Sequence, residues 1–246
     1  METKKGLELL ETLDLKPLDF FLTILKGEVN TAQILLATNR VISAPDDLFL
    51  RKFNKFLQST FLDVKWQLKA TRMFDTLQTR QDYAQRLLNI IQAIDDEKKI
   101  DYLANLTKAL LEELIDQPLY FKLINILQHI TREELNYLNE NINHNVAANL
   151  YTTALKSYNL VVSFVLPRDD KAQEALDDYH ENYEFTPLAL CMVKFAMRFG
   201  LESNEDEQRL DDYFSLIKAD KEDAFSMIKL ESLHGLELIY SVLQRQ

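Results

Sequence analysis

Glycine and proline are scarce in this chain, which contains four glycines and five prolines among its 246 residues. Glycine provides the positive backbone φ that tight turns and phosphate-binding loops require, so this count argues against dinucleotide-binding folds and against barrels with many turns. Proline and glycine also interrupt helices, whereas the plentiful Leu, Ala, Glu, Lys and Gln favour them. The sequence therefore predicts a mainly α-helical protein.

Start and stop signals for helices recur over residues 1–145 and predict a multi-helix bundle there. Pro17 and Gly27 bracket a short apolar helix, and Thr131 with Glu134 forms a capping box. The connections are short, so we expect neighbouring helices to run antiparallel. Further helix starts are expected at Asn30 with Gln33, at Thr79, at Asp95 with Asp96, and at Pro118.

Strand signals follow after about residue 145. Residues 146–157 are predicted to form a helix, and residues 160–166, which are rich in β-branched side chains, a strand. Residues 182–186 alternate polar and aromatic side chains, which predicts a second strand, and Pro187 then opens a helix. The sequence NYEFTPLALCMVKFAM resembles the winged-helix pattern in which a strand leads through such a segment into the next helix.

The expected organisation thus has three parts. A helical bundle occupies residues 1–145, and a winged-helix-like α+β segment with a short two-stranded hairpin occupies residues 146–200. The connection between its strands is expected to contain a helix over 169–179. A C-terminal helical pair is predicted over 201–246.

Charged residues are distributed unevenly along the chain. Residues 1–95 carry 13 basic and 12 acidic side chains, whereas residues 96–246 carry 15 basic and 27 acidic ones. Within residues 48–94, eight basic side chains face only three acidic ones. This basic stretch is a candidate patch for phosphate, an anionic membrane surface or an acidic partner. Two alternatives are a solvated helix face and a face neutralised by the acidic C-terminal half of the same molecule or of a neighbouring molecule.

The basic stretch also contains the only tryptophan, Trp66, and Trp and Arg are common anchors of protein interfaces. Core packing is the alternative role for Trp66. The predicted interaction residues are Arg51, Lys52, Lys55, Lys65, Trp66, Lys69 and Arg72.

The sequence contains two segments that resemble a known group of proteins. VISAPDDLFLRKFNKFL at 41–57 and RLLNIIQAIDDEKKIDYLANLTKALLEELIDQPLYFKLINILQHITREELNYL at 86–138 are similar to a group of uncharacterised helical proteins from bacteria and their mobile elements. The resemblance covers about residues 40–200 and implies a helical architecture with a winged-helix-like C-terminal segment. It also implies a prokaryotic or phage-associated protein in a defence or counter-defence setting, and it carries over no active site.

No motif predicts catalysis, a metal site or a cofactor. Asp177 with His180 and Glu231 with His234 have the one-turn spacing of di-iron helices, but such pairs arise by chance in a chain this acidic. Cys191 lies among apolar residues, which predicts a buried, inert thiol. The chain also lacks a nucleophile elbow, a phosphate-binding loop and a His-Glu-x-x-His motif.

The resulting hypothesis is a non-enzymatic regulatory protein that acts through contact with a protein partner in the cytoplasm. A homo-oligomer is kept as an alternative, and no segment predicts a membrane span. Two other functions stay open: a nucleic-acid-binding protein that uses residues 48–94, and an enzyme whose site assembles from scattered residues. The strongly acidic C-terminal half makes nucleic acid the less favoured partner, because such binding depends on neutralising phosphates.

Overall fold

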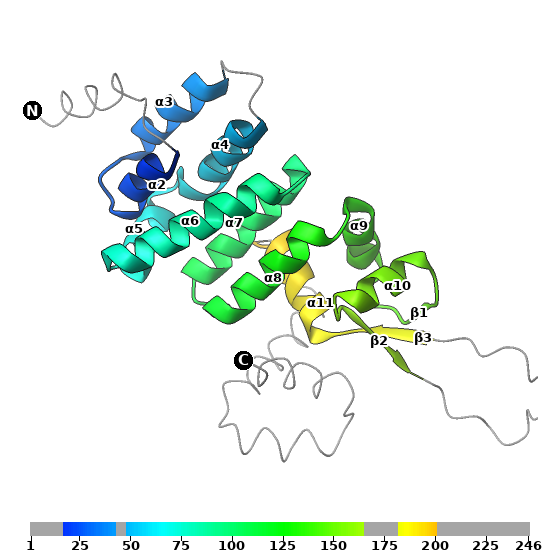
Figure 1. Ribbon diagram of the computed structural model, residues 1–246. Coiled ribbons are helices and arrows are strands. Elements are labelled where there is room, and N and C mark those ends of the chain that lie inside the picture. Colours follow the sequence, from blue (N-terminus) through cyan, green and yellow to red (C-terminus); the bar gives the residue numbers. More distant parts are fainter. Residues whose placement is uncertain (1–16, 43–47, 165–181, 201–246) are drawn as a thin grey trace, which may run out of the picture. The chain divides into compact units, whose positions relative to one another are not determined.

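The computed structural model describes residues 17–42, 48–164 and 182–200. The chain divides into two compact units, residues 1–129 and 130–246 (Figure 1). The prediction of a mainly helical protein is confirmed, and a small antiparallel sheet lies in the second unit. The domain limits expected after residues 145 and 200 stay predictions. The helix expected over 169–179 and the helical pair expected over 201–246 lie outside the described residues.

The first unit is built from consecutive helices with short connections. Helices α4, α6 and α7 are its most central elements, because α4 packs against α3, α5, α6 and α7, while α8 packs on α6 and α7 (Figure 1). The helices are α2 (Pro17–Leu25), α3 (Thr31–Ile42), α4 (Leu48–Phe61), α5 (Val64–Met73), α6 (Leu77–Ala93), α7 (Glu97–Leu111) and α8 (Gln117–His129).

Local capping explains where several of these helices begin and end. Asn30 and Gln33 exchange hydrogen bonds at the start of α3, as predicted, and Asp96 accepts a bond from the amide of Lys98 at the start of α7. Helix α2 ends at Leu25, and the turn that follows contains Gly27, whose φ of 72° is accessible to glycine at little cost. The prediction for α6 is wrong by one turn: Thr76 caps the helix and accepts from the amide of Thr79, which lies inside it.

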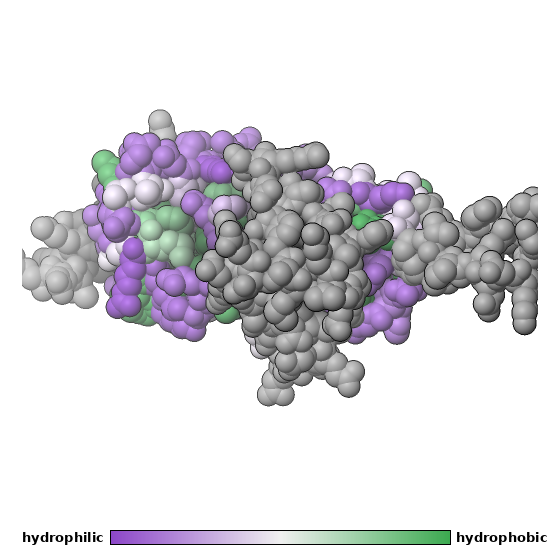
Figure 2. All heavy atoms as spheres, turned by 90° about the horizontal axis from the view of Figure 1, so that it is seen from below, coloured by the Kyte–Doolittle hydropathy of each residue, from purple (hydrophilic) through white to green (hydrophobic). Residues whose placement is uncertain are grey.

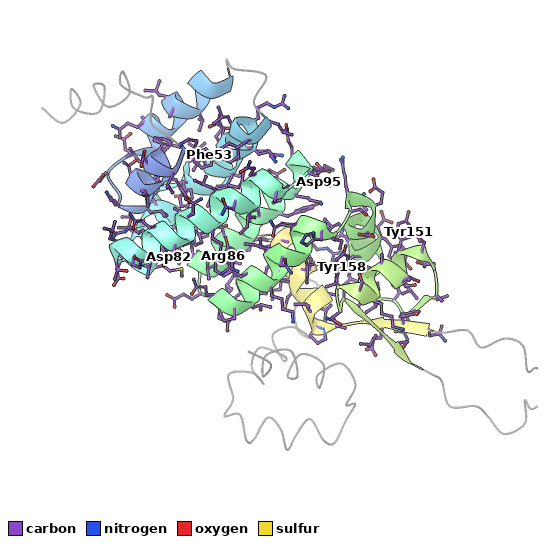
Figure 3. All side chains as sticks on the ribbon, viewed as in Figure 1. Phe53, Asp82, Arg86, Asp95, Tyr151 and Tyr158 are labelled. Atoms are coloured by element: carbon purple, nitrogen blue, oxygen red, sulfur yellow. The ribbon has the colours of Figure 1, made fainter. Side chains whose placement is uncertain are left out.

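An aromatic cluster forms the core of the first unit. Phe21 of α2 is fully buried, and its ring centroid lies 5.8–6.3 Å from those of four other rings. These rings are Phe53, Phe56 and Phe61 of α4, and Tyr83 of α6. Phe53 is labelled in Figure 3. Most of these pairs are tilted or edge-on, the arrangements that aromatic quadrupoles favour.

The second unit combines short helices with the sheet. In the described part the sheet has three strands in the order β1-β3-β2, and both pairings are antiparallel. Val161 pairs with Phe185 and Val146 pairs with Tyr183. The elements are α9 (Arg132–Asn141), β1 (Val146–Ala147), α10 (Leu150–Ser157), β2 (Val161–Phe164), β3 (Asn182–Phe185), α11 (Pro187–Cys191) and the π-helix η1 (Met192–Met197).

The sheet corrects one expectation from the sequence. The predicted helix over 146–157 begins only at Leu150, and its first two residues instead form β1, which adds a third strand to the predicted two-stranded hairpin. The cause is a second capping box, in which Asn149 accepts from the Thr152 amide and the Thr152 hydroxyl accepts from the Asn149 amide. The chain before Asn149 is therefore extended and pairs with β3. The capping box of Thr131 and Glu134 forms as predicted.

Candidate interaction site

Helix α7 pairs with the predicted interaction residues of α4. Lys55 forms an ion pair with Asp101 at 2.7 Å, and Arg51 forms one with Glu97 at 3.5 Å. The Lys55 ammonium also donates to the backbone carbonyl of Glu97 at 2.8 Å. These contacts place acidic groups of α7 beside the basic side chains of α4, within one unit. This arrangement corresponds to the alternative in which the basic stretch is neutralised within the fold.

Lys52 lies in the interior of the first unit, with 2% of its surface exposed. Its ammonium donates to the backbone carbonyls of Gln92 at 3.0 Å and Ile94 at 2.5 Å. These carbonyls belong to the C-terminal end of α6, where carbonyl groups lack helical partners and the helix dipole is negative. Burial lowers the pKa of Lys52, while the nearby Asp95 and Glu97 act in the opposite direction. The role of Lys52 is therefore structural.

The predicted residues of α5 meet the other end of α7. Lys65 and Lys69 both form ion pairs with Glu112, and their hydrogen bonds lower the pKa of its carboxyl group. Trp66 is half-buried, and the Lys65 ammonium lies 4.5 Å from its ring centroid. Arg72 is exposed and has no ion pair with any described residue.

The basic residues thus fall into two groups, one at each end of α7. Glu97 and Glu112 are 15 positions apart, which corresponds to about 22 Å along a helix axis. An interaction role for Arg51, Lys55, Lys65, Trp66, Lys69 and Arg72 stays a prediction. A partner at these residues would have to bind two separate groups of side chains. In both groups the cations already have acidic neighbours, except for Arg72.

A cavity of about 510 Å³ lies in the first unit between α5, α6 and the segment that joins α7 to α8. This volume falls within the usual range of ligand pockets. The walls combine apolar side chains with a few charged ones, as such pockets commonly do. Its apolar and aromatic side chains include Met73, Phe74, Tyr83, Leu110, Ile115 and Phe121. In the region of α5 and the start of α6, Figure 2 shows an apolar area bordered by hydrophilic residues.

Aromatic stacking and a buried hydroxyl chain hold one wall of the cavity in place. The Phe74 ring stacks on Tyr83 with a centroid distance of 4.1 Å. The Tyr83 hydroxyl lies 3.2 Å from that of Tyr120, which lies 3.0 Å from the Thr107 hydroxyl, and Thr107 donates to the carbonyl of Leu103. Each hydroxyl can therefore donate once, from Tyr83 to Tyr120 to Thr107. Burial raises the pKa of Tyr120 to about 12 and that of Tyr83 well above its usual value.

This wall makes stability sensitive to alkaline pH. The folded protein retains the phenolic protons of Tyr83 and Tyr120 at pH values where the unfolded chain loses them, at about pH 10. The folded state then binds more protons, so each phenol is expected to reduce the free energy of unfolding by up to about 1.4 kcal/mol per pH unit above pH 10. Urea unfolding at pH 9, 10 and 11 measures this loss. Tyr83→Phe keeps the ring and should make the loss less steep, whereas equal slopes in the two proteins would contradict the assignment.

Charged side chains line the polar part of the cavity. Asp82 and Arg86 lie one turn apart on α6 (Figure 3), while Glu113 and Asp116 come from the segment before α8. The Asp82 carboxylate accepts two hydrogen bonds from the side-chain amide of Gln78, at 2.8 and 3.0 Å. Asp116 caps α8 by accepting a hydrogen bond from the backbone amide of Leu119. The Arg86 guanidinium lies over the Phe121 ring at 3.4 Å from its centroid.

The sequence does not predict this cavity. Arg86 is one of the eight basic side chains of residues 48–94, and no motif singles out the other lining residues. The lining residues come from separate helices, so no spacing in the sequence marks them. A helical pair of opposite charges, Asp82 and Arg86, was the only local signal, and such pairs are common on helix surfaces.

The other chemical candidates can be placed only in part. Cys191 is buried, as predicted, and burial raises its pKa to about 12, which keeps the thiol protonated. Asp177 with His180 and Glu231 with His234 lie outside the described residues. Across residues 17–42, 48–164 and 182–200, no three His, Cys, Asp or Glu side chains are grouped as metal ligands would be.

Among the described helices, none is long and apolar enough to cross a membrane. No protein-family model matches the chain, and no curated protein or solved structure is significantly similar to it. The resemblance to helical proteins of bacteria and mobile elements, with its defence or counter-defence setting, therefore stays a prediction.

Proposed function

We propose that the protein is a non-enzymatic interaction protein whose cavity between α5, α6 and α8 receives a segment of a protein partner. The observation that carries the proposal is the combination of an open aromatic cavity with charged side chains that have few partners of their own. The side chains of Glu113 and Arg86 form no hydrogen bond or ion pair with any other described residue. Such groups can bond to a partner without first breaking internal contacts.

Exposed leucines beside the cavity support a protein partner over a small molecule. Leu114, which is 50% exposed, lies between the lining residues Glu113 and Ile115 in the chain. Leu77 is 56% exposed and begins α6, two positions before the lining residue Thr79. Exposed apolar side chains grouped beside a concave site are typical of protein interfaces.

The composition of the cavity gives less support to an enzyme. Its described lining contains no His, Cys, Lys or Ser, which are the commonest nucleophiles and general bases together with the carboxylates. The Tyr83 hydroxyl is protonated near neutral pH, as tyrosine ordinarily is, and burial raises its pKa further. The carboxylates Asp82 and Asp116 are already bonded to Gln78 and to the α8 backbone.

Nucleic-acid binding is the other alternative from the sequence, and the ion pairs of α7 weaken it. The basic side chains that pair with Glu97, Asp101 or Glu112 must break these ion pairs before they can contact a phosphate. Each such contact therefore contributes less to nucleic-acid affinity than a contact by an unpaired cation. Lys52 is buried and donates to backbone carbonyls. We therefore place the interaction surface at the cavity and not at the basic side chains of α4 and α5.

We also infer that residues 146–200 form a winged-helix-like segment. Strands β2 and β3 pair antiparallel across a long connection, as the two strands of a wing do, and Thr186 caps the helix that follows β3. Lys156, on the preceding helix, lies over the ring of Tyr183. The segment carries no cluster of basic residues, which favours a structural or protein-contact role.

Site-specific photo-crosslinking in native cells tests the proposed function. A photoreactive phenylalanine analogue is placed at Leu114, beside the cavity, and at Leu150, which is 81% exposed in the second unit. The analogue at Leu114 is expected to give one dominant crosslinked protein, and the analogue at Leu150 is expected not to give that product. The crosslinked protein is then purified and its binding to the wild-type chain and to Leu114→Asp is measured directly. Absence of a product at Leu114, or equal products at both positions, would contradict the proposal.

A further inference from the structure

The cavity carries a negative charge that its own residues do not balance. Asp82, Glu113 and Asp116 contribute three carboxylates, and Arg86 is the only cation among the described lining residues. A carboxylate has about four acceptor positions, so the bonds from Gln78 to Asp82 and from Leu119 to Asp116 leave acceptor capacity on both groups. A cationic group that enters the cavity would therefore meet carboxylates from two different walls.

The aromatic wall already holds a cation that belongs to the protein itself. The Arg86 guanidinium lies 3.4 Å from the centroid of Phe121. Asp82 lies only one turn away on α6, yet the two side chains form no ion pair. An aromatic face attracts a guanidinium through its quadrupole, and the preference of Arg86 for the ring shows that this position accommodates a planar cation.

We infer that the cavity recognises the cationic side chain of an arginine or lysine in the partner segment. This inference rests on the proposed function and names the chemistry of its partner. The incoming cation is attracted by the carboxylates of Asp82 and Glu113 and takes the place of Arg86 over Phe121. Arg86 is thus a competitor for the site, and the apolar residues beside the cationic side chain contact Leu77 and Leu114.

Competition by Arg86 predicts effects of opposite sign for variants of neighbouring residues. Removing a carboxylate lowers the attraction for a cation, whereas removing Arg86 raises it and uncovers the Phe121 ring. An anionic partner would reverse both signs, because Arg86 would then be its main ligand. The signs therefore identify the charge of the partner group independently of the absolute affinity.

The experiment is a titration of the full-length chain with two short peptides. The first is acetyl-Gly-Leu-Arg-Leu-Gly-amide, and the second has Glu in place of Arg. Methyl NMR signals of Met73, Leu110 and Ile115 report on the cavity, and the methyl signals of Leu150 serve as the distant control. The arginine peptide is expected to bind saturably with a Kd of about 1 mM, to shift the cavity signals only, and to bind more weakly at high salt.

Variants of exposed lining residues supply the decisive comparison. Asp82→Asn and Glu113→Gln are each expected to weaken the arginine peptide by about 2–5-fold, and Arg86→Gln to strengthen it by about 3–10-fold. Glu140→Gln and Lys98→Gln alter exposed charges that do not line the cavity, and they are expected to leave the Kd unchanged. All three test residues are exposed, so the variants should fold as the wild type does.

Three results would overturn the inference. The first is the absence of saturable binding of the arginine peptide up to about 10 mM, a concentration well above the expected Kd. The second is tighter binding of the glutamate peptide, and the third is weaker binding by Arg86→Gln. Binding of the glutamate peptide in the cavity would leave the proposed function intact and reject only the cationic partner. Failure of both peptides together with the absence of a crosslink at Leu114 would reject the proposed function as well.

Discussion

Replacing Phe21 by alanine is expected to lower the free energy of unfolding by about 3–5 kcal/mol. Phe21 is fully buried, and its ring contacts aromatic rings from α4 and α6. Removing the ring therefore leaves a cavity where α2 packs against α4 and α6. The surrounding rings are large and rigid, and they cannot collapse fully into the space. Urea unfolding followed by circular dichroism measures the change.

Phe49 provides the matched control for this substitution. Its ring also stacks on Phe53, with a centroid distance of 6.0 Å, but Phe49 is only half-buried. Phe49→Ala is therefore expected to cost about half as much as Phe21→Ala or less, because less surface leaves the core. A loss below about 1.5 kcal/mol for Phe21→Ala would contradict the described aromatic core.

Replacing Lys52 by methionine is expected to cost about 2–3 kcal/mol. Methionine retains most of the aliphatic stem but cannot donate hydrogen bonds. The backbone carbonyls of Gln92 and Ile94 at the end of α6 therefore lose the bonds that the Lys52 ammonium donates to them. Burial of the charge already lowers the pKa of Lys52, so the hydrogen bonds offset part of that cost in the native protein. Chemical denaturation at pH 7 measures the difference.

Lys55→Met is the control, because Lys55 is only partly buried. Its ion pair with Asp101 has side-chain exposures of 34% and 45%, and pairs at this exposure contribute at most about 1 kcal/mol. If Lys52→Met costs no more than Lys55→Met, then Lys52 is not a buried structural residue. In that case it would return to the predicted interaction surface.

The helical part of the fold is predictable where the signal is local. The capping box of Thr131 and the helix start at Asp96 depend on residues two or three positions apart, and these form as expected. Thr76 and Thr79 illustrate the limit, because threonine is a suitable N-cap at either position and the structure has Thr76 as the cap. Strand β1 was missed for a similar reason: two residues carry too little periodicity, and the strand depends on pairing with β3.

The candidate site is less predictable than the fold. The sequence indicates a basic stretch over 48–94, but neutralisation by α7 depends on contacts between residues about 40 positions apart. Lys52 could have been identified as internal, since it lies on the same side of α4 as Phe49, Phe53 and Phe56. The cavity could not, because its charged residues come from α6 and from the segment before α8, and neither group is unusual alone.

The excess of basic residues over 48–94 in the sequence does not form a free basic surface in the folded unit. The basic residues of α4 and α5 largely pair with acidic residues of α7, whereas the side chains of Glu113 and Arg86, which have no hydrogen bond or ion pair with a described residue, line the cavity. A surface of this kind selects partners by complementary charge and by apolar contacts at its edge. We therefore place the partner at α6 and α8 and not at the basic side chains of α4 and α5.

Hydrogen–deuterium exchange of the full-length chain, with and without the protein crosslinked at Leu114, tests this placement most directly. The account predicts slower exchange over residues 73–86 and 113–121, which contain most of the cavity lining, and little change over 48–61. Protection confined to 48–61, or to the second unit from residue 130 onward, would contradict the claim that the partner binds at the cavity.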